Sequence, residues 1–560
     1  MKTSIQVFSV CAIAALLQCQ TRPNNDEIQA ELQDINLSRG DIALCGTGDF
    51  GQVDFSLSCA ETVQQDFNLA TSMLHSFEYT EAEKVFAKII DRDPACIMAY
   101  WGVAMANFHP LWSPPGPEEL SKGLKTIQLA RKLDAASPRE AQYIETIATI
   151  FDGWENSDHK TRLKKFTEAS EALYLKYPQD KETAIFYALA LRASADPADK
   201  TFEKQKKAGE ILRNMFPAEP NHPGIAHYLI HIYDYPELAE IALPAARKYA
   251  AIASKSAHAL HMPSHIFTRL GLWEESIQSN ISSMDAARCY AEKLGKPGHW
   301  DQELHGLDYL VYAYLQQGND EKAKEQVEYL KTITDVFPAS GVNAYTFAAT
   351  PMRFAMERKD WKTAATLELG PANFAWDKHQ WEKAIHHFGK LMGAVQLKNI
   401  ATANAEFTEL EKIHTSLEQN KKEYEANQVS IQLKASEAWI QFMSGKKEEG
   451  LKLLTLAADM EDATEKHSVT PGEIVPAREL LGDMYMAAGN YTKAAEAYKA
   501  NLTKRPNRFN SLYGAAFASE KANNSTEARM YYSTLINVAG AANKNRQELV
   551  AADVFLKRTL

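Results

Sequence analysis

The chain has 560 residues, 45% of them hydrophobic, with a formal net charge of -11 and a pI near 5.9. This hydrophobic content is ordinary for a soluble globular protein. The acidic balance argues against a nucleic-acid-binding protein, which needs a basic face, and no basic amphipathic stretch indicates binding to anionic lipid. We therefore expect no nucleic acid among the partners.

The first residues have the features of an export signal. Lys2 is followed by an apolar run over residues 5–17, which is too short to span a bilayer as a stable helix. A polar stretch comes next. We predict a signal segment over residues 1–18 and a polar N-terminal linker over residues 19–44.

The apolar run leads to Cys19, which resembles the lipidated cysteine of a bacterial lipoprotein signal. Gln18 departs from that pattern, which has a small residue just before the cysteine. We expect a lipid anchor at Cys19 that holds the protein at the outer membrane or the cell surface. The alternative is ordinary cleavage nearby and a free periplasmic or secreted protein. In both cases the protein is exported, and only the anchor would touch a membrane.

Two of the remaining cysteines, Cys45 and Cys59, frame a glycine-rich loop ahead of the helical part of the chain. We predict a disulfide between them, because exported proteins keep their disulfides. Closing a loop of about 15 residues would contribute about 3 kcal/mol in the chain-entropy model. Cys96 lies in an apolar helical run, and we expect it to be buried and inert.

Residues 481–506 carry the pattern of a tetratricopeptide (TPR) repeat, a helix–turn–helix unit of 34 residues. The TPR pattern has a small residue at position 8, Gly at 15, an aromatic residue at 17, Ala at 20, an aromatic residue at 24 and Pro at 32. With Gly489 at position 15, the other positions are filled by Gly482, Tyr491, Ala494, Tyr498 and Pro506. Small residues let the two helices approach closely, and the proline ends the second helix because it cannot donate a backbone hydrogen bond.

A second match lies over residues 77–94, with Tyr79, Ala82, Phe86 and Pro94 at the same positions. Weaker matches follow near Gly271, Gly318 and Trp361, and residues 115–215 are helical by pattern but poor in consensus. The sequence therefore predicts an all-α, TPR-type solenoid, which in this family is a right-handed superhelix.

A break between two repeat blocks is predicted at residues 332–345, where Pro338 and Gly341 interrupt the helical pattern. The first block would span residues 45–331 and carry a histidine-rich groove. The second would span residues 346–560.

Half of the 16 histidines lie between residues 222 and 305. His227 and His231 are four residues apart, as are His261 and His265, and the second pair follows the first by 34 residues, one repeat length. With Gly271 at position 15, positions 2, 5 and 9 of one repeat are His258, His261 and His265, and the first pair takes positions 5 and 9 of the repeat before. Residues at this spacing share one face of a helix.

In the following repeat, His305 takes position 2 and Asp308 position 5. The TPR likeness implies that this helix face lines the concave groove, so three neighbouring helices should present five or six imidazoles and one carboxylate to one wall. His75 and His109 are also 34 residues apart, and we expect them in the groove several repeats away.

Histidine pairs four residues apart can chelate a metal, and neutral imidazole suits zinc, copper, nickel or iron. Three imidazoles with Asp308 or water would complete a tetrahedral site. The hypothesis is a divalent transition metal, zinc or copper, held by members of this set: His227, His231, His258, His261, His265, His305 and Asp308. The alternative is a polar or pH-responsive groove without a metal.

A pair of carboxylates, Glu479 and Asp483, takes positions 5 and 9 of the best-matching repeat. Paired carboxylates can perform acid–base chemistry, so these two are the candidate catalytic residues if the protein is an enzyme. A solvated polar groove is the commoner explanation.

Several runs resemble those of a group of bacterial exported TPR proteins, namely residues 222–231, 261–271, 75–102 and 476–483. This resemblance implies the fold and no established activity, so no catalytic role follows from it.

Three functions are consistent with these patterns. The first, which we favour, is an envelope scaffold whose groove binds a protein or small-molecule partner or a transition metal. The second is a metal-dependent enzyme. The third is a cell-surface accessory protein in assembly or in glycan and nutrient utilisation, since large helical-repeat lipoproteins do such work in some bacteria.

Overall fold

The computed structural model describes residues 25–45, 49–111, 113–133, 135, 137–540 and 546–558. The predicted signal, Cys19 and the first residues of the linker lie outside the described residues. Within them the regular elements are helices apart from two short strands, β1 (His299–Trp300) and β2 (Val336–Phe337), which pair in parallel. The predicted all-α, TPR-type fold is confirmed. No described helix is long and apolar enough to cross a membrane.

The N-terminal helices are α1 (Asn25–Gln33), α2 (Gln64–His75), α3 (Tyr79–Arg92), α4 (Ile97–Ala106), α5 (Pro117–Lys132), α6 (Pro138–Phe151), α7 (His159–Lys176), α8 (Lys181–Ala193) and α9 (Glu203–Met215). The central helices are α10 (Pro223–Tyr233), α11 (Ala239–Ile252), α12 (Ala257–His261), α13 (Pro263–Leu270), α14 (Trp273–Leu294), α15 (Asp301–Gln316), α16 (Asp320–Lys331) and α17 (Gly341–Glu357).

The C-terminal helices are α18 (Trp361–Thr366), α19 (Gln380–Gln396), α20 (Ile400–Gln419), α21 (Glu423–Met443), α22 (Lys447–Ala463), α23 (Ala477–Ala487), α24 (Tyr491–Lys504), α25 (Phe509–Lys521), α26 (Ser525–Ala539) and α27 (Gln547–Arg558). Short 3-10 turns lie at η1 (Glu61–Val63), η2 (Trp154–Asn156) and η3 (Trp376–Lys378).

The best-matching repeat forms the hairpin of α23 and α24. Gly489 ends the first helix with a φ of 75°, and Asn490 begins the second by accepting a hydrogen bond from the Lys493 amide. A Cβ at Gly482 would lie 2.6 Å from the ring of Tyr498, so this position requires glycine for the two helices to pack. The TPR pattern therefore has a direct steric cause in this chain.

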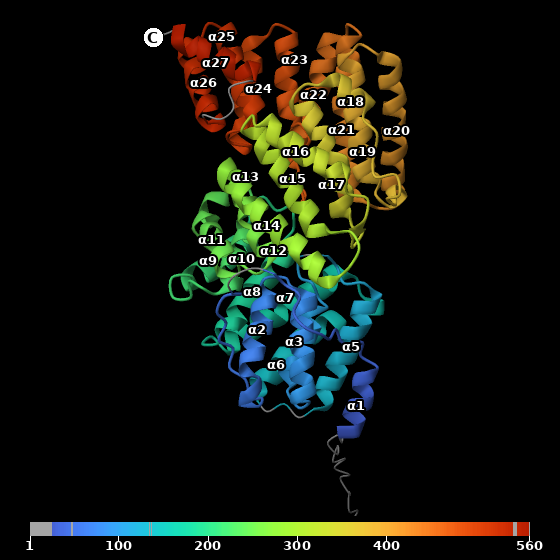
Figure 1. The fold of residues 1–560 in the computed structure, drawn as a ribbon, viewed down its shortest axis with the longest axis vertical. Coiled ribbons are helices and arrows are strands. Elements are labelled where there is room, and N and C mark those ends of the chain that lie inside the picture. Colours follow the sequence, from blue (N-terminus) through green and yellow to red (C-terminus); the bar gives the residue numbers. More distant parts are fainter. Residues whose placement is uncertain are drawn as a thin grey trace, which may run out of the picture.

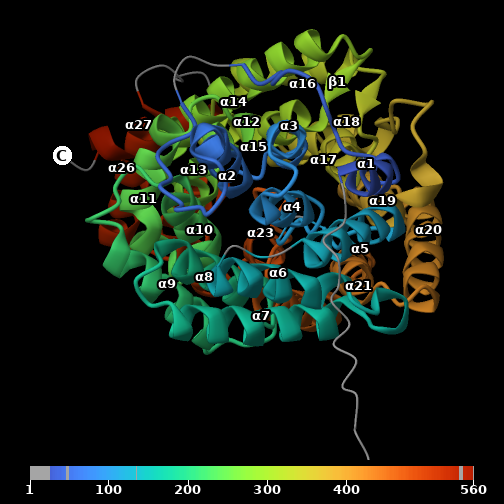
Figure 2. The same ribbon diagram turned by 90° about the horizontal axis from the view of Figure 1, so that it is seen from below.

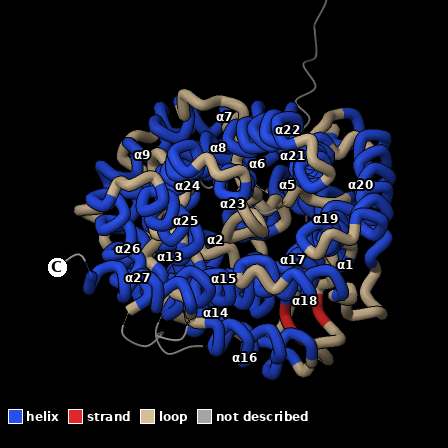
Figure 3. The backbone as a smooth tube through the Cα atoms, turned by 90° about the horizontal axis from the view of Figure 1, so that it is seen from above, coloured by secondary structure: helices blue, strands red, loops and turns tan. Residues whose placement is uncertain are grey.

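The helices stack along one long axis, from α1 at one end to α25, α26 and α27 at the other (Figure 1). Seen along that axis, they run round the molecule (Figure 2), and the two short strands lie at the rim of this ring (Figure 3). Between α16 and α17, where the break is predicted, the chain forms a loop that contains β2. Helices α15 and α17 pack against each other across this loop.

Contacts between distant repeats close the superhelix. Helix α2 packs on α10, and α15 packs on α25. The Trp273 indole donates to the Asn507 carbonyl at 2.9 Å, and the Tyr309 hydroxyl donates to the Thr470 carbonyl at 3.1 Å. These contacts place residues side by side that are far apart in the repeat order.

The predicted disulfide between Cys45 and Cys59 is wrong. The structure pairs Cys45 with Cys289 and Cys59 with Cys96. Cys96 stands at the N-cap of α4, in the turn after α3, where the segment before η1 passes. Cys45 reaches α14 because the superhelix brings that helix back to the N-terminal segment. Cys96 is buried, as expected, but it is bonded.

Candidate metal centre

Three helices, α10, α12 and α13, carry five of the six candidate histidines, and each begins at a defined signal. Pro223 occupies the first turn of α10, where its missing N–H costs nothing. The Ser256 hydroxyl accepts from the Ala259 amide and caps α12. Pro263 begins α13, and Gly271 ends it with a left-handed φ of 65°. These signals fix which faces of α10, α12 and α13 point inward.

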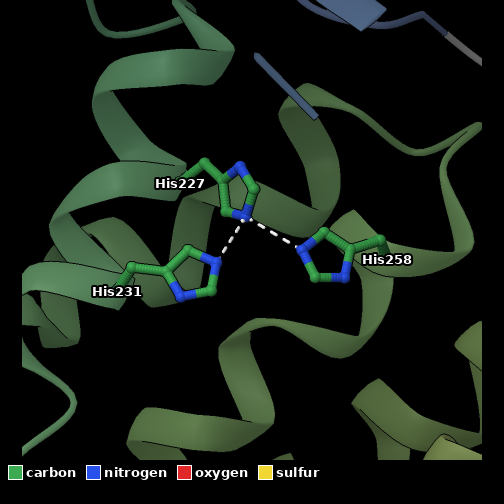
Figure 4. Close-up of side chains that lie close together, drawn as sticks. All are labelled: His227, His231 and His258. Carbon is green, nitrogen blue, oxygen red and sulfur yellow. Dashed lines mark hydrogen bonds between the residues drawn. The ribbon is translucent and has the colours of Figure 1, made fainter. Parts of the chain in front are cut away.

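The first triad consists of His227 and His231 on α10 and His258 on α12 (Figure 4). The Nε2 atom of His227 lies 3.0 Å from Nε2 of His258 and 3.0 Å from Nε2 of His231. The other ring nitrogen of His227, Nδ1, is 2.6 Å from the backbone carbonyl of His75. Because a carbonyl can only accept, Nδ1 carries the proton and Nε2 presents a lone pair to the two neighbouring rings.

The second triad consists of His261 on α12, His265 on α13 and His305 on α15. Nε2 of His261 lies 3.0 Å from Nε2 of His265, and the ring of His305 packs on that of His261 with centroids 4.1 Å apart. Nδ1 of His261 lies 2.7 Å from Oδ1 of Asn280, and Nδ1 of His265 lies 3.1 Å from Oδ2 of Asp234. These outer partners turn the Nε2 atoms of both rings toward each other.

The two triads are neighbours, since the rings of His231 and His265 have centroids 6.5 Å apart. Asp234, which holds His265, also accepts from Arg269 at 2.8 Å and lies 3.6 Å from the ammonium of Lys466. Five of the six histidines are buried, and His231 is partly exposed. The candidate centre is therefore an enclosed group of imidazoles with charged residues on one side.

Burial keeps the imidazoles of both triads neutral. It lowers the pKa of His227 to about 3, because the charged form loses its hydration. Burial is also the largest cause that lowers the pKa of the other five histidines. Lys466 lowers the pKa of His261, His265 and His305 further, whereas Asp234 raises that of His265. Neutral imidazole is the form that binds a metal ion, so at neutral pH no proton has to be displaced.

Replacing His227 by glutamine is expected to make the metal-free protein less sensitive to acid. The pKa of His227 is about 3 in the folded protein and 6.5 in the unfolded chain, so between these values only the unfolded chain binds the proton. The folded state of the wild type therefore loses stability as the pH falls below 6.5, by about 2 kcal/mol at pH 5 for a single group. Urea unfolding of both proteins at pH 7 and pH 5 measures this difference. An equal response of the two proteins to pH would contradict the expectation.

The structure does not place Asp308 in either triad, contrary to the prediction. Its Oδ1 atom accepts from Thr350 at 3.0 Å and pairs with the buried guanidinium of Arg353. The repeat pattern predicts the helix face on which Asp308 lies. It does not predict that Arg353 of α17 pairs with this carboxylate.

Neither candidate catalytic carboxylate is free. Glu479 accepts from Arg508 at 2.8 Å and from Ser511 at 2.5 Å, and all three side chains are buried. Asp483 accepts from Lys359 at 3.0 Å and from the Tyr498 hydroxyl at 2.7 Å. These carboxylates hold helices together, so the structure gives no support to a general base at either position.

Sequence reasoning missed a third group, formed by His75, Glu182 and His222. The Glu182 carboxylate lies 2.9 Å from Nε2 of each histidine, and Nδ1 of His75 lies 2.9 Å from the Tyr228 hydroxyl. His75 was expected several repeats from the main cluster, but the packing of α2 on α10 places its carbonyl against His227. No local signal in the sequence indicates this contact.

No protein-family model and no curated protein matches the chain. Among solved structures, a tetratricopeptide repeat protein from Parabacteroides merdae ATCC 43184 is 13% identical, with a TM-score of 0.29, over 54% of this chain and 98% of that one. Human IFIT1, solved as a dimer with m7Gppp-AAAA, is 11% identical, with a TM-score of 0.34, over 87% and 97%. The APC/C hetero-tetramer Cut9-Hcn1 is 14% identical, with a TM-score of 0.30, over 89% and 90%. Similarities of this size say nothing about what the present chain binds.

Proposed function

We propose that the protein is an exported TPR-type scaffold that binds transition-metal ions through its two histidine triads. The observation that carries this proposal is the geometry of the first triad. Two rings direct Nε2 at the single Nε2 lone pair of His227, each at 3.0 Å. One lone pair accepts one good hydrogen bond, so hydrogen bonding accounts for only one of these contacts. A metal ion shared by the three nitrogens would satisfy all of them.

The outer partners support the same proposal. Metal-binding histidines usually donate their other ring N–H to a carboxylate or carbonyl, which fixes the tautomer and raises the basicity of the ligand nitrogen. In this chain the carbonyl of His75, the amide oxygen of Asn280 and the carboxylate of Asp234 stand in that position. Three neutral imidazoles suit zinc or copper, with a fourth position for water or an exogenous ligand.

Metal analysis of protein purified without a histidine tag tests this proposal. We expect metal-free protein to bind two zinc or copper ions per chain in calorimetry. The double variant His227→Gln, His231→Gln should bind one ion, and so should His261→Gln, His265→Gln. A matched control is His386→Gln, His387→Gln, which changes an adjacent pair on α19 and should leave two ions bound.

Absence of binding by the folded wild type would overturn the proposal. So would full binding by both triad variants. Circular dichroism of every variant separates loss of binding from loss of fold.

Export belongs to the same proposal. Two disulfides support it, since such bonds persist in oxidising compartments. Incorporation of a labelled lipid precursor by the wild type, and its loss in Cys19→Ser, would support an anchor. An unlabelled wild type would exclude one.

A further inference from the structure

A cavity of about 360 Å³ opens beside the first triad, and His258 forms part of its wall. Its walls are aromatic and acidic. The aromatic part comes from Phe77, Tyr79, Tyr290 and Trp300, and the carboxylates are Glu78, Glu81, Glu119 and Asp301. The lining contains no lysine or arginine. This size falls in the range of small-molecule sites.

Two of the residues that line this cavity carry a buried acceptor atom without a donor. These atoms are Oε1 of Glu78, whose residue is 6% exposed, and Oε1 of Gln302, whose residue is 4% exposed. Neither atom has a hydrogen-bond partner among the described residues. A buried acceptor without a donor is costly, so a ligand in this cavity should bring donors.

The charge of the cavity walls indicates that the ligand that brings these donors is a cation. Glu78 and Asp301 form no ion pair within the part of the chain that the structure describes. Burial raises the pKa of Glu78 to about 8 and that of Asp301 to about 7, because no cation offsets the lost hydration. A cationic ligand would supply the missing charge.

The walls favour an organic cation over a bare metal ion. Among the described residues, these carboxylates do not converge closely enough to form a chelating group. The rings of Phe77 and Tyr79 are stacked with centroids 5.4 Å apart, and those of Tyr290 and Trp300 lie 4.3 Å apart. Aromatic faces attract ammonium groups and cover the apolar part of such a ligand. A primary ammonium also has only N–H donors, which matches the two acceptors.

We propose that this cavity binds an organic ammonium ion, with the ammonium between Glu78 and Gln302, its apolar part against Trp300 and Phe77, and His258 at its inner wall. This site goes beyond the proposed metal binding and does not depend on it. It would, however, bring an amine next to the first triad.

Calorimetry on the full chain tests the proposal with benzylammonium, butylammonium and tetramethylammonium. Benzyl alcohol and benzoate serve as the neutral and anionic counterparts of benzylammonium. We expect at least one of the two primary ammonium ions to bind, and benzylammonium to bind at least about tenfold more tightly than benzyl alcohol, since a hydrogen bond to a charged group is worth about 1.5 to 3 kcal/mol. Ammonium binding is measured with both metal-free and zinc-loaded protein, so the result can be interpreted even if the protein binds no metal.

The isosteric variant Glu78→Gln should weaken ammonium binding by at least about tenfold. Glu274→Gln is the matched control, because Glu274 lines a different cavity and should have no effect. Binding of no ammonium at millimolar concentration, equal binding of benzyl alcohol, or unchanged binding in folded Glu78→Gln would each overturn the proposal.

Discussion

Replacing Arg508 by methionine is expected to destabilise the folded protein by about 3 to 5 kcal/mol. Arg508 is fully buried at the start of α25. Its guanidinium donates to Glu479 at 2.8 Å and to Glu357 at 2.5 Å, and it lies 3.3 Å from the Tyr312 hydroxyl. One side chain thus joins α15, α17, α23 and α25, and its removal leaves two buried carboxylates without the cation that pairs with both of them.

Urea unfolding measures this loss. The matched control is Arg131→Met, which breaks a partly exposed pair with Glu145 and Asp152 and should cost no more than about 1 kcal/mol. A triple variant that also carries Glu357→Gln and Glu479→Gln should regain part of the stability, because it removes the uncompensated charges. An Arg508→Met midpoint equal to that of the wild type would show that this network contributes little.

Removing the disulfide between Cys45 and Cys289 is the second change with a large expected effect. The bond links residues separated by 244 positions, and the chain-entropy model gives a stabilisation of about 5 kcal/mol for such a loop. We expect the variant Cys45→Ser, Cys289→Ser to unfold at clearly lower urea under oxidising conditions. Limited proteolysis should also cut the N-terminal segment earlier, because this bond ties it to α14.

The control for this prediction is the wild-type protein with its disulfides reduced. With a strong reductant present, the wild type loses both of its disulfides and should approach the stability of a variant that lacks all four cysteines. If the oxidised wild type and the Cys45→Ser, Cys289→Ser variant unfold at the same midpoint, the bond does not constrain the unfolded chain as expected.

Local periodicity let the sequence predict the helical hairpins and their spacing. Gly482, Gly489, Tyr498 and the other pattern residues predict the repeat because each acts within one hairpin. The same period predicts which helix face His227 and His261 share, since neighbouring repeats place equivalent positions side by side. The structure does bring the six candidate histidines into one region. That they bind a metal stays a prediction.

Only the tertiary structure decided how these residues are partnered. It divides the six candidate histidines into two triads, pairs Asp308 with Arg353, and pairs Glu479 with Arg508. It also places His75 against His227 and pairs Cys45 with Cys289. These contacts join repeats that are far apart in the chain. They depend on the curvature of the superhelix, which accumulates from small rotations between successive repeats. No single repeat determines this curvature. Local sequence patterns therefore predict which helix faces point inward but not the contacts between distant turns of the superhelix.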